Sequence, residues 1–325
     1  MDEGFFPLDK RLGLDSGSLS PGLAKVVVWL SGQLSYEQVC VVMERIGGIG
    51  VARSTVWECV QKHGKRLVAF QRHQQGQVSL ERTRWEHQRY QALLRKGVSM
   101  DGGMVNIRGE GWKEMKVGLV YSLLEPAFQD EREAAPVCHD LHYTAVLGGV
   151  EQFSPALWAL AVQNAIPYAG YVAVTADGAP WIWNLSADLF PTSTQIVDYY
   201  HAAQHLAAAA QARFPTDALA AKRWTDQLKT FLLKDEVWKI IDALSGEALD
   251  DFVAYFDEHR YRMLYATFRA QGYPIGSGAT ESTVKQYKQR FCGPGMRWSR
   301  PGAHGMIVIR SAVLDDPFDR LWQAA

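Results

Sequence analysis

Three acidic residues that lie far apart in the sequence have the side chains and the local settings for shared chemistry. Asp101 lies in VSMDGGMVNIR, Asp177 in GYVAVTADGAPWIW and Glu281 in YPIGSGATESTVKQYKQR. Carboxylates that converge on folding repel one another, and either protonation or a bound cation relieves that repulsion. Carboxylate oxygens favour a hard divalent ion such as Mg²⁺ or Mn²⁺. Their joint occurrence therefore predicts metal-dependent chemistry on phosphate esters.

Two such ions, about 3.5–4 Å apart, would hold the attacking and leaving oxygens of an in-line displacement. Each acid also has a purely structural explanation. Asp-Gly pairs such as those at Asp101 and Asp177 are common in turns, and the helix dipole favours a glutamate in a first helical turn, as expected for Glu281. The hypothesis depends on the three residues together.

A second group of polar residues, Asp198, His201 and His205, follows a predicted strand. We expect Asp198 and His201 to support the acidic site or to contact the scissile phosphate. Two alternatives stay open. Asp198 can simply cap the next helix. His201 and His205, one helical turn apart, can bind zinc, although no third ligand has a comparable spacing.

The charged residues are unevenly distributed. The net charge of the 325-residue chain is -1, yet the stretch 282–314 contains no acidic residue. Its basic residues are Lys285, Lys288, Arg290, Arg297, Arg300 and Arg310. Charge runs are usually solvated faces, but this one begins directly after Glu281 and therefore predicts phosphate binding. Trp298, in the segment GPGMRWSR, is expected to be exposed and able to stack on an unpaired base.

The N-terminal region has the pattern of two helices joined by a glycine turn. We expect helices over 22–33, 36–46 and 52–63, with Ser35 and Gln38 forming a capping box. Helix, glycine turn and helix together indicate a helix-turn-helix, although many helical hairpins never bind DNA. The candidate DNA contacts there are Arg53, Ser54 and Thr55.

The rest of the chain predicts an α/β fold. The expected strands are 98–107, 115–124, 143–147, 171–176 and 194–199, with helices over 149–165 and 179–190. The order β-β-β-α-β-α-β describes a mixed sheet with three antiparallel strands followed by strands that arrive through helical crossovers. Asp101 and Asp177 are each expected to end a strand, where ligands of α/β sheets collect.

We predict the following division of the chain: a helix-turn-helix region (1–64), a helical linker (65–96), the first part of the core (97–201), a helical insertion (202–272), the C-terminal part of the core with a basic helix (273–314) and a tail (315–325). No signal peptide or membrane span is evident, so a cytoplasmic protein without a membrane partner is expected. The four scattered cysteines indicate neither a zinc ribbon nor a redox motif.

Four blocks of this sequence strongly resemble the Kra-type insertion-sequence transposases, members of the DDE transposase superfamily. They are DGGMVNIRGEGWKEMKVGLVY, TADGAPWIWNL, DYYHAAQHL and GSGATESTVKQ followed by GPGMRWS. The resemblance implies a ribonuclease-H-like core with a helical insertion. It also implies that Asp101, Asp177 and Glu281 are the metal-binding catalytic triad. Asp198 and His201 match the Asp-x-x-His signature of several such families.

The implied function is metal-dependent cleavage of DNA at transposon ends and strand transfer to target DNA, with two Mg²⁺ or Mn²⁺ ions. The implied partners are DNA and further copies of the chain, as a homodimer or higher oligomer, in the prokaryotic cytosol and at the nucleoid when bound to DNA. Relatives carry a cysteine-rich segment before the FFPLD block at which this chain begins, and its absence predicts weaker DNA binding. A catalytically inactive or truncated transposase-derived DNA-binding protein is the first alternative. A glycoside hydrolase is the second, and the basic stretch argues against it.

Overall fold

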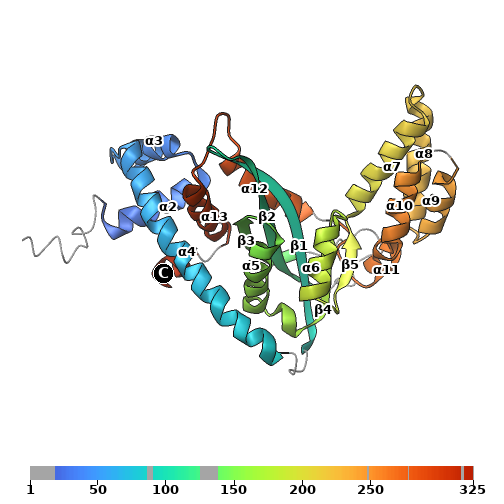
Figure 1. Ribbon diagram of the computed structural model, residues 1–325, viewed down its shortest axis with the longest axis horizontal. Helices are drawn as coiled ribbons and strands as arrows, with labels where there is room; N and C mark the ends of the chain where they lie inside the picture. Colours follow the sequence, from blue (N-terminus) through green and yellow to red (C-terminus); the bar gives the residue numbers. More distant parts are fainter. Residues whose placement is uncertain are drawn as a thin grey trace, which may run out of the picture.

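The computed structural model describes residues 19–85, 91–124, 138–246, 249–276, 278–315 and 318–324. The molecule is elongated, with a β-sheet between two helical ends (Figure 1). Helices α2 (Pro21–Gln33), α3 (Tyr36–Gly47) and α4 (Arg53–Trp85) form one end. None of the helices in the described residues is both long enough and apolar enough to cross a membrane.

The first helices begin and end where the sequence predicted. Ser20 caps α2 ahead of Pro21, and the capping box of Ser35 and Gln38 opens α3. Gly48 ends α3 in the left-handed conformation, with φ of 63°. The expected helix, glycine turn and helix are therefore present.

Helix α4 is longer than the third helix that the sequence predicted over 52–63. It continues without a break from Arg53 to Trp85, so the third helix and the expected linker are one element. Gly64 lies within the helix, at the point where α4 packs closely against another helix. A Cβ atom at Gly64 would lie 3.1 Å from the Cα of Gly305 on α13 (Arg300–Leu314). The first and last parts of the chain are thereby packed together.

Five strands form one mixed sheet in the order β3-β2-β1-β4-β5. They are β1 (Gln91–Ile107), β2 (Gly111–Leu123), β3 (Cys138–Leu147), β4 (Ala169–Ala176) and β5 (Thr194–Val197). The first three are antiparallel neighbours, whereas β4 is parallel to both β1 and β5. The helices α5 (Val150–Gln163) and α6 (Pro180–Leu189) connect β3 to β4 and β4 to β5. The predicted α/β class with a mixed sheet is confirmed.

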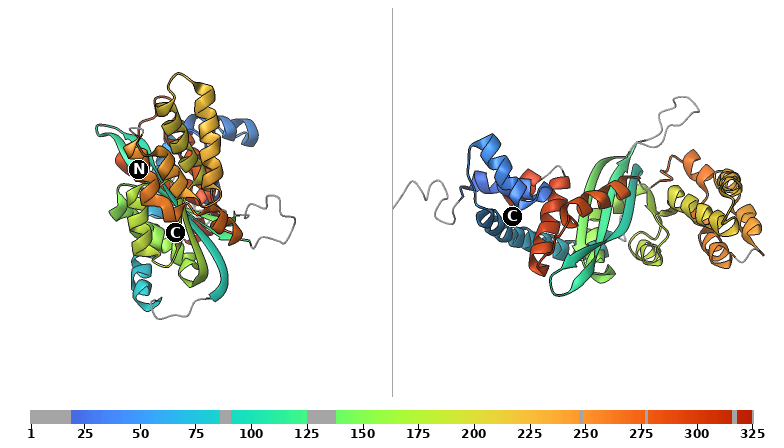
Figure 2. Two further views of the ribbon diagram at one scale, coloured as in Figure 1. Left: turned by 90° about the vertical axis from the view of Figure 1, so that its right-hand side faces the viewer. Right: turned by 90° about the horizontal axis from the view of Figure 1, so that it is seen from above.

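Opposite faces of the sheet are covered by different helices. A Cβ at Gly118 on β2 would meet Leu157 of α5 at 2.9 Å, whereas Val117 belongs to the core formed with α12 (Gly278–Phe291) and α13. Because successive residues of a strand point to opposite faces, α5 lies on one face and α12 and α13 lie on the other. Two views at right angles show the sheet between these layers (Figure 2).

The second helical end is the expected insertion. It contains α7 (Tyr199–Arg213), α8 (Ala218–Leu232), α9 (Val237–Leu244), α10 (Asp250–His259) and α11 (Tyr265–Ala270). The chain then returns to the sheet, where Ile275 O accepts a hydrogen bond of 2.8 Å from the backbone N–H of Tyr199. The predicted tail contains a further short helix, α14 (Phe318–Ala324).

Candidate active site at the sheet edge

The parallel strands bring three aspartates to one edge of the sheet. Ser99 of β1 pairs with Thr175 of β4, and an aspartate follows each of them by two residues: Asp101 within β1 and Asp177 directly after β4. On the other side of β4, the backbone N–H of Asp198 donates a 2.7 Å hydrogen bond to the carbonyl of Ala176. The predicted convergence of Asp101 and Asp177 is therefore present, and Asp198 is beside them.

Asp101 does not end its strand as predicted. Strand β1 continues to Ile107 because its outer half pairs with β2 as a long hairpin. Pairing with β4 stops at Ser99, however, so Asp101 lies just beyond the point where the β4 neighbour is lost. It reaches the edge because β4 is short.

The charges around Asp101 define the site. Burial raises the pKa of the Asp101 carboxyl, and the negative charge of Asp177 raises it further. The backbone N–H of Gly102, Lys288 and His201 act in the opposite direction and lower this pKa. A cation from α12 and a histidine from α7 therefore lie within electrostatic range of the Asp101 carboxylate.

Asp177 and Asp198 are held by the helices that follow them. The Oδ1 atom of Asp177 accepts a 3.0 Å hydrogen bond from the N–H of Ala179, just before α6. Asp198 is buried and caps α7, its Oδ1 accepting a 2.8 Å hydrogen bond from the N–H of His201. The capping role that the sequence allowed for Asp198 is thus real, and the backbone of Asp198 lies beside the end of β4, one residue before Asp177.

The helical insertion adds residues that sequence reasoning did not identify. The Tyr255 ring of α10 stacks on His205 at a centroid distance of 3.8 Å, and its buried hydroxyl has no hydrogen-bond partner in the described part of the chain. Burial raises the pKa of the Tyr255 hydroxyl, and the charges of Asp177 and Asp198 raise it further. A Cβ at Gly178 would lie 3.3 Å from this hydroxyl. The spacing Tyr-x-x-x-His at Tyr255 and His259, one helical turn, was the available signal.

Glu281 is less well placed. It lies in the first turn of α12, half-exposed, with Lys285 Nζ 3.5 Å from its Oε2. Lys288 is seven residues further along α12, two helical turns, and so lies on the same side of the helix as Glu281. Because Lys288 is near Asp101, this side of α12 faces the acidic edge. Within the described residues, however, no group of three His, Cys, Asp or Glu side chains is close enough to hold a metal ion.

The donors at the edge suit a hard cation, although the set is incomplete. Asp101 and Asp177 offer carboxylate oxygens that repel each other, which is the arrangement that Mg²⁺ or Mn²⁺ relieves. Glu281 would complete the set only after releasing Lys285. The zinc alternative is weaker, because the rings of His201 and His205 are 5.6 Å apart and His205 is stacked on Tyr255.

Two of the predicted DNA contacts are buried. Arg290 is 3 % exposed and donates from Nε to the carbonyl of Ser31 at 2.6 Å. Trp298, expected to be exposed, is 8 % exposed, and its Nε1 donates to Phe291 O at 3.1 Å. The glycines around Trp298 allow the loop to fold back onto β1, where Trp298 pairs with Ile107. Both predictions of a surface position were wrong.

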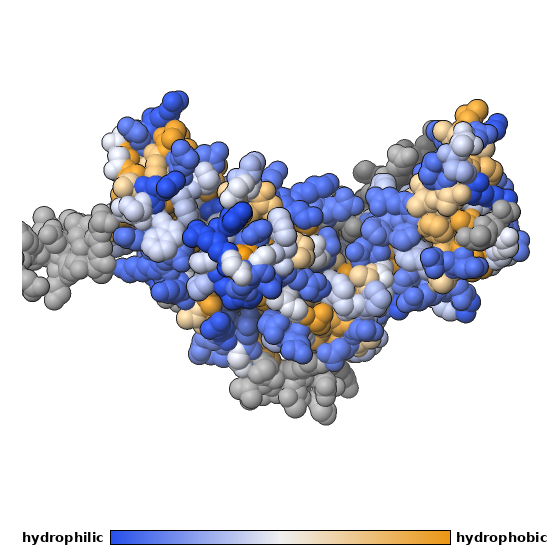
Figure 3. Space-filling model, turned by 45° about the horizontal axis from the view of Figure 1, so that its top comes forward, coloured by the Kyte–Doolittle hydropathy of each residue, from blue (hydrophilic) through white to orange (hydrophobic). Residues whose placement is uncertain are grey.

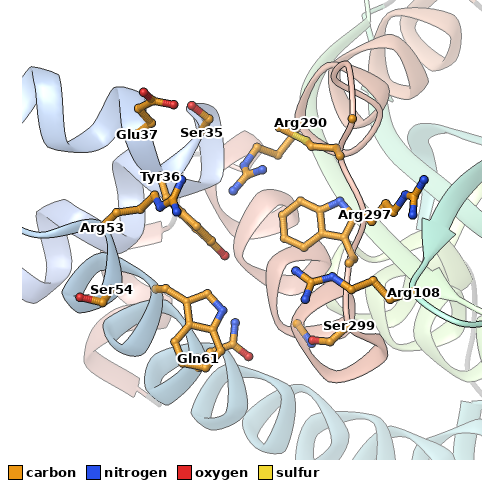
Figure 4. Close-up of a pocket in the computed structure, with 15 residues that line it drawn as sticks. Ser35, Tyr36, Glu37, Arg53, Ser54, Gln61, Arg108, Arg290, Arg297 and Ser299 are labelled. Atoms are coloured by element: carbon orange, nitrogen blue, oxygen red, sulfur yellow. The ribbon is translucent and has the colours of Figure 1, made fainter.

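The other candidate DNA contacts lie mainly at the surface. Lys285, Lys288, Arg297, Arg300, Arg53 and Ser54 are exposed, and Thr55 is partly buried. Arg300 is paired with Glu110, its Nε lying 3.0 Å from Oε1. Arg53, Ser54 and Arg297 instead line a groove of about 860 Å³ between the N-terminal helices and the loop before α13 (Figure 4). None of the three edge aspartates lines this groove.

No model of a known protein family matches the chain. No curated protein matches it either.

Proposed function

We propose that this protein is a DNA transposase of the DDE type, which cleaves phosphodiester bonds at transposon ends and joins them to target DNA. The observation that carries the proposal is the register of β1, β4 and β5, which brings Asp101, Asp177 and Asp198 to one edge. Lys288 of α12 lies within electrostatic range of the Asp101 carboxylate. Clustered acids beside a cation suit a site that holds metal ions and a phosphate.

The architecture supports a ribonuclease-H-like assignment of the core. A mixed sheet has three antiparallel strands followed by two parallel ones, and helices α7 to α11 separate it from α12. This is the arrangement that the resemblance to DDE transposases implied. Since a fold of this kind serves several chemistries, the functional proposal depends on the acidic edge.

The residues have distinct roles in this proposal. Asp101 and Asp177 would hold Mg²⁺ or Mn²⁺, and Glu281 would complete the ligand set. When bound, two such ions activate the attacking oxygen and stabilise the leaving oxygen of the phosphodiester. Lys288 binds the DNA phosphate next to the carboxylates. Asp198 orients the first turn of α7 and, with it, His201.

The proposal is tested with a duplex oligonucleotide that carries the ends of the element, incubated with Mn²⁺ and analysed for 3′-hydroxyl products. We expect Asp177→Asn to abolish cleavage while DNA retention in a gel-shift assay is preserved. Asp226→Asn is the matched control, because Asp226 is an exposed residue of α8 that pairs with Lys222. This variant should cleave DNA at the wild-type rate. Cleavage by Asp177→Asn at the wild-type rate would contradict the assignment.

A second function, a catalytically inactive DNA-binding derivative, is favoured by one observation. The Glu281 side chain contacts Lys285 rather than the aspartates. Lys285→Ala would free Glu281. Retention of DNA by the wild type without nicking in Mg²⁺ or Mn²⁺, and still without nicking in Lys285→Ala, would favour this alternative.

A further inference from the structure

The groove at the N-terminal end of the molecule has the chemistry of a nucleic-acid site. Its volume is about 860 Å³, and its lining includes four arginines against one carboxylate, Glu37. Arg53 comes from α4, Arg108 from the turn after β1, Arg290 from α12 and Arg297 from the loop before α13. Four cations from four elements give a positive potential that no single stretch of sequence reveals.

The three outer arginines, Arg53, Arg108 and Arg297, are exposed. Within the described residues, none of them forms an ion pair with a carboxylate, in contrast to Arg300, which is paired with Glu110. A second hollow of about 620 Å³ adjoins the groove and shares Arg108 and Arg297 with it. The two unpaired guanidinium groups therefore stand between two hollows, as expected along the path of an extended polyanion.

The floor of the groove is formed by two buried polar side chains that interact with each other. They are Arg290, which is 3 % exposed, and Tyr36, whose ring lies under the Arg290 guanidinium at 5.4 Å. Burial lowers the pKa of Arg290 to about 10 and raises the pKa of Tyr36, and the hydrogen bond between the two side chains acts against burial in each. Arg290 is therefore held by Tyr36 and by the carbonyl of Ser31, and it adds positive charge beneath the exposed arginines.

The wall of the groove offers a surface for a base. Trp57, on the second turn of α4, lines the groove and is 50 % exposed. Figure 4 shows Tyr36 and Arg53 extending from the N-terminal helices toward Arg290 and Arg108 on the opposite side. An exposed indole beside guanidinium groups is the usual combination for holding a single strand, because bases stack on the ring while arginines bind phosphates.

From this geometry we infer that the groove binds a DNA strand with at least one unpaired nucleotide, its phosphates on Arg108 and Arg297 and its base against Trp57. The choice of DNA as the polyanion rests on the proposed function. The groove joins the start of α4, the second helix of the helix-turn-helix, to the loop that follows α12. One strand can therefore contact the N-terminal helices and the sheet-bearing part of the molecule together.

The test is fluorescence anisotropy of a labelled 20-nucleotide DNA, single-stranded and as a duplex, with EDTA present so that no cleavage occurs. We expect the wild type to bind the single strand, and Trp57→Ala and the double variant Arg108→Ala/Arg297→Ala each to bind it about tenfold more weakly. The double variant should also reduce the slope of log K against log salt by about 1.4, since each lost phosphate contact on a single strand contributes about 0.7.

Matched controls come from the helical insertion. Trp238→Ala removes an indole that is 64 % exposed on α9, and Arg223→Ala removes an exposed arginine of α8. Both should bind DNA as the wild type does. Circular dichroism and thermal unfolding of all variants show whether each one folds, and the exposed side chains replaced here should leave the melting temperature unchanged.

The alternatives to a strand site have distinct results. Binding of Trp57→Ala and the double variant with wild-type affinity and salt slope would overturn the inference. Displacement of the strand by millimolar inorganic phosphate as readily as by excess unlabelled strand would also overturn it, because the groove would then be a simple anion site. If the wild type cleaves DNA but the groove variants bind DNA normally, the groove inference is refuted and the transposase proposal stands. If the wild type binds single strands through the groove but never cleaves DNA, the transposase proposal is refuted and the groove inference stands.

Discussion

Asp101 occupies a position that folding alone does not favour. Burial and the neighbouring charge of Asp177 both raise the pKa of its carboxyl, and only Lys288, His201 and the Gly102 N–H act against them. A group whose charged form is penalised in the folded state reduces stability at neutral pH. Such positions are typical of functional sites, where stability is given up for chemistry.

Replacing Asp101 by Asn should therefore stabilise the protein in the absence of metal. We expect the melting temperature of Asp101→Asn at pH 7 to rise by roughly 1–3 °C, because a penalised charge is removed. Mg²⁺ or Mn²⁺ should raise the melting temperature of the wild type and have no effect on the variant, since only a folded site binds the ion. Differential scanning calorimetry with and without the ion measures both. An equal metal effect on both proteins would exclude Asp101 as a ligand.

Tyr255 is a second residue of the site that burial does not favour. Its hydroxyl is buried and makes no hydrogen bond within the described residues. The hydroxyl lies close enough to Asp177 and Asp198 for their charges to raise its pKa. A buried hydroxyl without a hydrogen-bond partner reduces the stability of the fold. A position beside two carboxylates of the proposed site is instead suited to donating a hydrogen bond to Asp177 or to a bound phosphate.

The variant Tyr255→Phe separates these possibilities. It removes no hydrogen bond made among the described residues, so we expect an unchanged or slightly higher melting temperature. DNA cleavage in Mn²⁺ should fall about tenfold, the change in rate that corresponds to the loss of one hydrogen bond of about 1.4 kcal/mol. Tyr261→Phe is the control, because Tyr261 is 72 % exposed. Full cleavage by Tyr255→Phe would mean that the hydroxyl has no part in the reaction.

Helix α13 and the end of α12 show how basic residues can serve the fold instead of a ligand. Arg310 donates from Nη1 to the carbonyl of Gly32 and from Nη2 to that of Gln286, each at 3.1 Å. Arg290 donates to Ser31 O. Both arginines fix the C-terminal helices to the end of α2. Part of the stretch 282–314 therefore stabilises the packing of helices inside the molecule. For this reason the number of its basic residues overestimates the surface available to DNA.

A histidine on β3 interacts with the C-terminal end of α13. His142 of β3 lies 2.7 Å from Oδ1 of Asp315 through Nδ1, and 3.3 Å from Oδ1 of Asp140 through Nε2. The hydrogen bond to Asp315 and the charges of both aspartates raise the pKa of His142 above its ordinary 6.5, against the effect of burial. The protonated ring is therefore the form that holds β3 and α13 together.

This pair should make stability depend on pH. Because the folded pKa of His142 is raised, its stabilisation is complete below pH 6.5 and is lost as the pH rises through the folded value. We expect His142→Gln to cost about 1 kcal/mol at pH 6 and much less at pH 9, as measured by urea unfolding. Asp315→Asn should remove most of the difference between the two pH values. A cost for His142→Gln that stays constant with pH would contradict this explanation.

Secondary structure was largely predictable, because its signals are local. The capping box at Ser35, the order of the strands and helices of the sheet, and the helical insertion all follow from short-range patterns. The sequence predicted that the third helix ends before Gly64, because glycine disfavours a helix. In the structure Gly64 lies inside α4, where it allows close contact with Gly305 of α13. A position that is set by packing against another element leaves no local signal.

At the scale of the whole molecule, sequence reasoning predicted the acidic edge but not the groove. The two aspartates could be placed together because parallel strands end at the same edge. The groove is formed by α3, α4, the end of β1, the end of α12 and the loop before α13, and its lining extends from Ser35 to Gly302. Nothing local in the sequence indicates that these segments meet. The same folding buried Trp298 and Arg290. The face between the two helical ends is largely hydrophilic in the view of Figure 3.

Strand β1 connects the groove to the acidic edge, and its length sets a distance on the DNA. Asp101 is six residues before Ile107, which bridges to Trp298 beside the groove. At about 3.3 Å per residue this span is about 20 Å. If the DNA between the two sites is a duplex, with the unpaired nucleotide confined to the groove, a strand that follows β1 at about 3.4 Å per nucleotide would place about six nucleotides between the sites.

Phosphate-ethylation interference measures this spacing directly. The scissile phosphate is first mapped with the wild type and Mn²⁺, and contacts are then mapped in EDTA. We expect Arg108→Ala and Arg297→Ala to lose interference at phosphates about six nucleotides from the scissile position, because these arginines lie at the groove end of β1. Arg223→Ala should keep the wild-type pattern. Interference lost more than about twelve nucleotides away, or at the scissile phosphate itself, would show that the strand does not run along β1 from one site to the other.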